Sequence, residues 1–141
     1  MTLPELIAAL KAAAEPSREL DLAIRDIEIL WTGTIQIGEI GGDDWLYLGV
    51  NGPFPYRHPV GYVSNSPKIV YCPRYTGSID AALTLVPKGW RVATIGQNDN
   101  GSWWCELREG HITSYASVVF GLKSPTAPLA LCIAALKARM A

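Results

Sequence analysis

Apolar residues recur at helical spacing in four stretches of the chain. In the clearest stretch they lie at i, i+3, i+4 and i+7, namely Ile79, Ala82, Leu83 and Val86. Ser78 or Thr76 can cap the start of this helix with a side-chain oxygen, and Pro87 and Gly89 end it. The four stretches predict helices over residues 3–14, 17–28, 78–86 and 127–139.

The pattern changes to strict alternation after Gly89. Three segments alternate between apolar and polar positions, residues 90–97, 102–108 and 115–120. The turn Asn98-Asp99-Asn100-Gly101 between the first two is typical of a hairpin, because Asn and Gly tolerate positive φ. These segments predict an antiparallel meander whose inner face includes Trp103, Cys105 and Leu107, and residues 121–128 are expected to form a loop.

Residues 31–70 give a weaker pattern. Short apolar runs at 35–37, 45–50 and 68–71 are typical of strands, but glycines and prolines are dense between them. We therefore expect a loop-rich insertion that adds one to three short strands to the meander. The whole pattern predicts an α+β fold, an α/β/α sandwich with a small, mainly antiparallel sheet covered by helices.

Length and composition predict a single domain over residues 1–141. No apolar run approaches the roughly 20 residues that span a bilayer, so we expect no membrane partner. The first residues lack the pattern of a signal peptide, and three scattered cysteines do not form a disulfide framework. These features favour a cytoplasmic protein with reduced thiols.

Charge is divided unequally along the chain although the net charge is only −1. Residues 1–50 carry three Lys or Arg against nine acids, a net −6, whereas residues 51–141 carry nine against four, a net +5. Complementary patches of this kind could promote self-association, but two solvated faces that cancel on folding are the favoured interpretation.

Several kinds of reactive site can be weighed from residue types. Zinc ligands would have to come from Cys72, Cys105, Cys132, His58 and His111. None of these forms the closely spaced pair that structural zinc sites use, so no metal and no cofactor are predicted. Nucleophilic catalysis by Cys72, which we expect to be partly exposed, with His58 as base has no supporting motif.

Carboxylate chemistry is a further alternative. Glu39, Asp43 and Asp44 flank a Gly-Gly pair and could hold a cation or act as acid and base, but a solvated turn is favoured. A small-ligand site or an enzyme in residues 31–70, using Glu39, Asp43, His58 or Cys72, is therefore kept as the second hypothesis. No phosphate-binding glycine motif occurs.

Aromatic residues supply the favoured binding candidates. Tyr56, Arg57 and His58 lie in an aromatic, proline-stiffened segment, and Trp104 is one of two adjacent tryptophans that must point to opposite faces of a strand. Basic and aromatic residues also interleave between residues 56 and 91, as in nucleic-acid binders, but the acidic net charge weakens that interpretation.

A family resemblance rests on the helix caps, the apolar stripes and the tryptophan that opens a strand. The segments concerned are Ser17–Asp21, Tyr75–Leu83, Val86–Trp90 and Thr126–Ala138. They resemble an α-β-α sandwich domain family encoded by phages and prophages of proteobacteria, across about 100 of the 141 residues, in 3–30 and 71–141. The family has no assigned activity, so the resemblance implies a fold and a phage-related origin but no catalytic residue.

Taken together, these features predict an accessory protein that binds rather than catalyses. Its partner would be a host or phage protein or a second copy, and the contact residues would be Tyr56, Arg57, His58 and Trp104.

Overall fold

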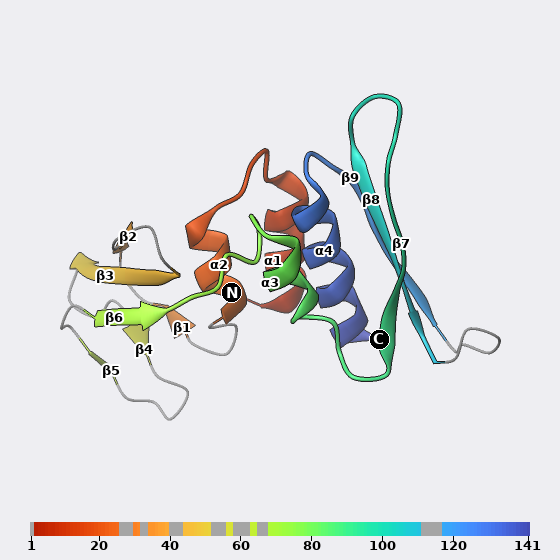
Figure 1. Ribbon diagram of the computed structural model, residues 1–141. Helices are drawn as coiled ribbons and strands as arrows, with labels where there is room; N and C mark the ends of the chain where they lie inside the picture. The colour runs from red at the N-terminus through yellow and green to blue at the C-terminus, as the bar shows by residue number, and fades with distance from the viewer. Residues whose placement is uncertain are drawn as a thin grey trace.

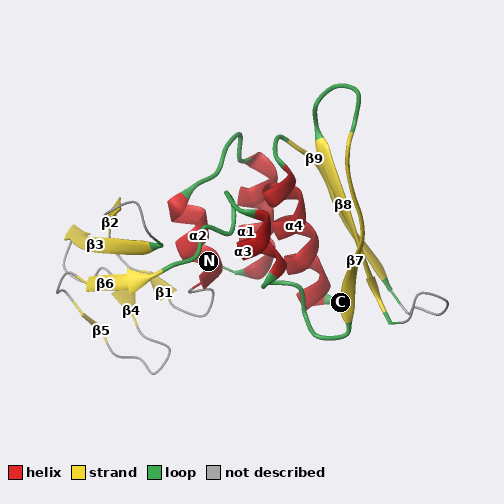
Figure 2. Cartoon of the chain, viewed as in Figure 1, coloured by secondary structure: helices red, strands yellow, loops and turns green. Residues whose placement is uncertain are grey.

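The computed structural model describes residues 2–25, 30–31, 34–39, 44–51, 56–57, 63–64, 68–110 and 117–141. Side chains are described for residues 2–25, 44, 71–110 and 117–141. Four helices and nine strands make up these parts of the chain (Figures 1 and 2).

The first two helices begin at well-formed caps. Helix α1 (Leu3–Ala12) starts with a capping box, in which the Glu5 N–H donates to Thr2 Oγ1 at 3.3 Å and the Thr2 N–H donates to Glu5 Oε2 at 3.1 Å. Helix α2 (Arg18–Arg25) starts where Ser17 Oγ accepts the Leu20 N–H at 3.2 Å. The predicted Ser17 cap is confirmed, and the remainder of the 17–28 prediction lies outside the described residues.

Helix α3 (Ile79–Leu83) is shorter than the predicted 78–86. Ser78 is its cap and accepts the Ala81 N–H at 3.3 Å. Thr76, the other candidate, is buried and bonded to other residues instead. After Leu83 the backbone tightens to i→i+3 bonds, such as Val86 N–H to the Leu83 carbonyl at 3.2 Å, so the last turn is not α-helical.

The predicted meander is present as β7 (Trp90–Gln97), β8 (Trp103–Glu109) and β9 (Val118–Ser124), antiparallel and in that order. The third strand was predicted at 115–120, and the loop predicted from residue 121 is wrong as far as Ser124. Gly121 is the reason for the error. Glycine usually weakens a strand, but here its missing side chain lets β9 pass directly against α4.

Helix α4 (Ala127–Met140) lies at the centre of the packing (Figure 1). One side contacts β8 and β9, and the other contacts α1 and α3. Every residue from Leu129 to Leu136 is therefore buried. The α+β class with a small antiparallel sheet packed against helices is confirmed, and the layers run from the sheet through α4 to α1 and α3 (Figure 2).

The strands predicted near 35–37, 45–50 and 68–71 are present, but they do not extend the meander. They form their own antiparallel sheet of β2 (Thr34–Glu39), β3 (Trp45–Asn51) and β6 (Lys68–Tyr71). A third small sheet contains β1 (Leu30–Trp31), β4 (Tyr56–Arg57) and β5 (Val63–Ser64). Among the described helices, none has both the length and the apolar character needed to cross a bilayer.

Candidate functional site

The two faces of the β7–β8–β9 sheet differ sharply. Trp103, Cys105 and Leu107 of β8 point toward α4, as predicted, and Cys105 and Leu107 are fully buried. Because side chains alternate along a strand, Trp104, Glu106 and Arg108 point away from the helices. We call this second side the outer face of the sheet.

Large apolar residues of β9 gather on the outer face. Val118, Phe120 and Leu122 are 37%, 39% and 53% exposed. Phe120 lies opposite Glu106 in the register, and Val118 lies opposite Arg108. Three exposed apolar side chains on successive outward positions of one strand form a continuous apolar strip, which is the arrangement expected of a binding surface.

Trp104 adds a half-buried aromatic ring to the outer face. Its indole covers Gly96 on β7, because a Cβ on that glycine would lie only 2.6 Å from Trp104 Cζ2. The glycine therefore provides the space in which the ring lies. The two adjacent tryptophans lie on opposite faces of β8, as the sequence predicts, with Trp103 packed on the core and Trp104 over Gly96.

Charged side chains lie beside the apolar strip. Arg91 of β7 is directly opposite Arg108 of β8 in the register. Arg108 Nε donates to Glu106 Oε2 at 2.6 Å, so these two opposite charges pair within one strand. The Nε atom of Arg91 is buried and has no hydrogen-bond partner among the described residues. The outer face thus combines apolar and aromatic area with one unsatisfied cationic donor.

The other predicted contact residues fall in the small sheet. Tyr56 and Arg57 form β4, between β1 and β5, and their side chains lie outside the described residues. His58 also lies outside them, so the structure does not bring this trio together with Trp104. The contact prediction for Tyr56, Arg57 and His58 remains a prediction.

Residues of the second hypothesis are only partly described. Asp44 forms an ion pair with Arg74 at 3.5 Å. Glu39 ends β2, and Asp43 lies outside the described residues. The prediction that Cys72 is partly exposed is wrong: Cys72 is fully buried, and its N–H donates to the Asp44 carbonyl at 2.6 Å.

The three cysteines are free and buried, and two have strongly shifted acidity. Burial raises the pKa of Cys105 to about 12. Burial, and secondarily the negative charge of Asp21, raises the pKa of Cys132 as well. Both thiols therefore stay protonated at neutral pH and are poor nucleophiles or metal ligands. Within the described parts of the chain, no three His, Cys, Asp or Glu side chains are grouped as a metal site would require.

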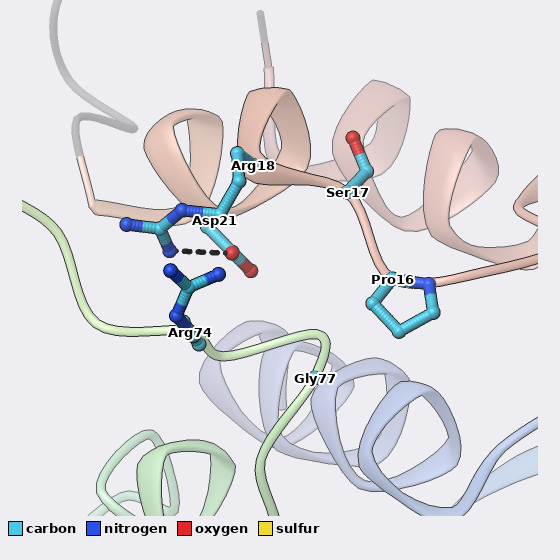
Figure 3. A pocket seen from close by; sticks show the side chains of 6 residues that line it. All are labelled: Pro16, Ser17, Arg18, Asp21, Arg74 and Gly77. Atoms are coloured by element: carbon cyan, nitrogen blue, oxygen red, sulfur yellow. Dashed lines mark hydrogen bonds and ion pairs between the residues drawn. The ribbon is translucent and has the colours of Figure 1, made fainter. Parts of the chain in front are cut away.

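A polar cluster between α2 and the segment before α3 lines a small pocket of about 100 Å³ (Figure 3). Asp21 is 1% exposed, yet all its main contacts are made: Arg18 Nη1 donates to Oδ2 at 2.8 Å, and the Thr76 N–H and hydroxyl both donate to Oδ1 at 2.7 Å. Arg18 Nη2 also donates to the Cys72 carbonyl at 2.7 Å.

The pocket is too small for a typical ligand. Small-molecule sites usually enclose about 300–1,000 Å³. The Arg18 and Arg74 side chains both approach Asp21, and each charge already has an acidic partner nearby (Figure 3). This cluster therefore explains how α2 is held against residues 72–77, and it does not define a reactive centre.

Sequence reasoning missed the apolar strip on β9 and the donor on Arg91. The signal was available, because Val118, Phe120 and Leu122 alternate with Val119 and Gly121. The loop predicted over residues 121–128 cuts this alternation short. Comparisons with known protein families, with curated proteins and with solved structures find no match to this chain.

Proposed function

We propose that this chain is a non-catalytic binding module that holds another protein on the outer face of β7–β8–β9. The observation that carries the proposal is the strip of Val118, Phe120 and Leu122, more than a third exposed at each position and next to the half-buried Trp104. Contiguous exposed apolar area marks interaction sites, and tryptophan is enriched among the residues that dominate binding energy at protein interfaces.

The cellular setting remains part of the same proposal. The residue pattern of the helices and of Trp90 supports a phage- or prophage-derived accessory protein whose partner is a host or phage protein. Three free, buried thiols in the described residues suit a reducing cytoplasm. A binding role is favoured over catalysis because the Asp21 carboxylate of the described polar cluster is fully engaged by Arg18 and Thr76 and the described pocket is small.

Site-specific cross-linking tests the proposal. A photo-cross-linking residue is placed at Phe120, 39% exposed on the outer face, or at Leu83, 41% exposed on α3, as a matched control. After expression in a bacterial host, we expect one protein to cross-link from position 120, to be competed by excess unlabelled wild-type chain, and not to cross-link from position 83.

Surface substitutions provide the second arm. The double variant Phe120→Ser/Leu122→Ser should lose the partner, whereas Leu83→Ser should retain it, with both remaining folded by circular dichroism. Equal cross-linking from both positions, or unchanged capture by the double variant, would contradict the proposal. Cross-linking only to a second copy of the chain would replace a heterologous partner by self-association and so also overturn it.

A further inference from the structure

The two arginines on the outer face are placed where like charges repel. Arg91 and Arg108 are directly opposite one another on neighbouring strands, and side chains at such positions lie on the same face about 5 Å apart. Glu106 neutralises one of the two, through its 2.6 Å contact with Arg108 Nε. Among the described residues of this face, the charge of Arg91 is left without an acidic partner.

Arg91 also has a hydrogen-bond donor without an acceptor among the described residues. Its Nε atom is buried and has no hydrogen-bond partner among the described residues. Leaving a charged, buried donor unsatisfied is unfavourable, and folded proteins pair nearly all such groups. A partner cannot reach this covered atom, but the terminal nitrogens of the same half-buried guanidinium are not covered, and an acceptor on a binding partner can bond to them.

The surroundings define the chemistry of that acceptor. The register places Val118 of β9 opposite Arg108, so the arginine pair adjoins the exposed apolar strip. A free inorganic anion would leave this strip in water. Nucleic acid is disfavoured because Glu106 lies on the same face and the chain carries a net charge of −1. A polypeptide segment with a carboxylate next to apolar side chains can meet both needs: the carboxylate accepts from Arg91, and the apolar side chains cover the strip.

We infer that the outer face binds a polypeptide segment in which an Asp or Glu adjoins large apolar residues, with its carboxylate accepting from Arg91. This inference rests on the proposed function, because it names the partner chemistry of the same face. Hydrogen bonds that involve a charged group are about twice as strong as neutral ones. The carboxylate therefore sets specificity, while Phe120 and Leu122 supply the apolar contact.

A random peptide library displayed on yeast provides the probe. The wild-type chain should select peptides that carry Asp or Glu beside Leu, Phe or Trp. For a selected synthetic peptide, changing its acid to the amide should weaken binding about tenfold, which corresponds to about 1.4 kcal/mol. The same loss is expected from Arg91→Gln, and binding by the wild type should weaken as salt rises.

Control variants separate charge from folding. Lys88→Gln removes one exposed positive charge just before β7 and should leave binding unchanged. Arg91→Lys keeps the charge but lacks the planar guanidinium, so it should bind more weakly than wild type and more tightly than Arg91→Gln. The peptide substitution needs no change in the protein, and so it tests the inference even if an Arg91 variant unfolds.

The outcomes distinguish this inference from the proposed function. If Phe120→Ser/Leu122→Ser abolishes binding while Arg91→Gln and the amide peptide bind normally, the carboxylate inference is overturned and the proposed function stands. Selection of neutral or basic peptides would overturn it in the same way. If neither the apolar nor the arginine variants affect binding, both proposals fail.

Discussion

At the scale of single residues, Asp21 organises the junction between α2 and residues 72–77. A carboxylate that is 1% exposed would be costly if it were isolated, but three donors from Arg18 and Thr76 satisfy it. Arg18 then extends the network to the Cys72 carbonyl. Removing one partner from such a network costs more than the pair contributes, because the other charge stays buried without compensation.

Asp21→Asn tests this role. The amide can still accept from Thr76, but its NH₂ group then faces the Arg18 donors, so we expect the free energy of unfolding to fall by about 3 kcal/mol. Urea unfolding followed by tryptophan fluorescence measures the change. Glu19→Gln, an exposed acid in the same turn of α2, should shift the free energy by less than about 0.5 kcal/mol. Equal effects of the two substitutions would show that Asp21 is not a structural centre.

Two glycines provide a matched test of packing. A Cβ at Gly121 would lie 2.0 Å from the Ala130 carbonyl oxygen, a backbone atom that cannot rotate away, whereas a Cβ at Gly77 meets nothing nearer than Pro16 Cβ at 3.5 Å. Gly121→Ala should therefore destabilise the protein by about 3 kcal/mol or more. Gly77→Ala should change the stability by less than about 1 kcal/mol. Thermal unfolding of both variants checks this, and a stable Gly121→Ala protein would refute the close approach of β9 to α4.

At the scale of elements, β9 is an edge strand, and Lys137 covers part of its unpaired backbone edge. The Glu109 N–H donates to the Ser117 carbonyl at 2.9 Å. Because hydrogen-bonded and non-hydrogen-bonded residue pairs alternate between antiparallel strands, the N–H and C=O groups of Val118 and Phe120 point away from β8. Lys137 of α4 donates from Nζ to the Phe120 carbonyl at 2.8 Å. A lysine on an edge strand's backbone is one way in which proteins discourage edge-to-edge pairing.

Lys137→Met should uncover this edge. We expect a stability loss of about 1 kcal/mol from the missing bond, and a concentration-dependent dimer in sedimentation velocity. Lys11 is the matched control: its charge is one of the causes that lower the pKa of Lys137, after burial. Lys11→Met should therefore leave the bond to Phe120 intact and the chain in its wild-type oligomeric state. If Lys137→Met changes neither the stability nor the oligomeric state, other contacts protect the edge.

The elements also show what the sequence could predict. The Ser78 cap and the apolar spacing identified α3, although not its end at Leu83, and the apolar spacing identified α4. The Asn98–Gly101 turn identified the hairpin, because these signals are local. The extent of β9 was missed because Gly121 is explained by its contact with α4, which no local pattern reveals. The strands of residues 31–70 were recognised as strands, but their pairing into separate sheets depends on long-range partners. The donor of Arg91 was invisible for the same reason, since its environment is formed across strands.

At the scale of the whole molecule, α4 joins the two halves of the described core. It contacts the meander on one side and α1 with α3 on the other, so nine of its fourteen residues are buried. This burial also places the Cys132 thiol against the Tyr75 carbonyl at 3.1 Å and encloses Cys105 under the sheet. Because burial raises the pKa of both thiols, their pKa values depend on an intact core.

Stability should fall steeply in alkaline solution. Burial raises the pKa of Cys105 from 9.0 to about 12, and raises that of Cys132 too. Between these values the unfolded chain releases thiol protons that the folded chain keeps, so the free energy of unfolding decreases as pH rises above 9. The slope is about 1.4 kcal/mol per pH unit for each thiol. Tyr75, whose pKa is raised chiefly by burial, acts in the same direction above pH 10.

Lys137 opposes this trend, since a lowered lysine pKa makes stability rise with pH up to about 10.5, but one group cannot cancel three. Urea unfolding at several values between pH 8 and 11 measures the net slope. Cys105→Ala should make the slope shallower by about 1.4 kcal/mol per pH unit. Leu107→Ala, an equally buried position on the same strand, should lower stability at every pH and leave the slope unchanged. An identical slope in wild type and Cys105→Ala would mean that water reaches this thiol in the folded protein, and the core beneath the outer face would then be looser than its packing indicates.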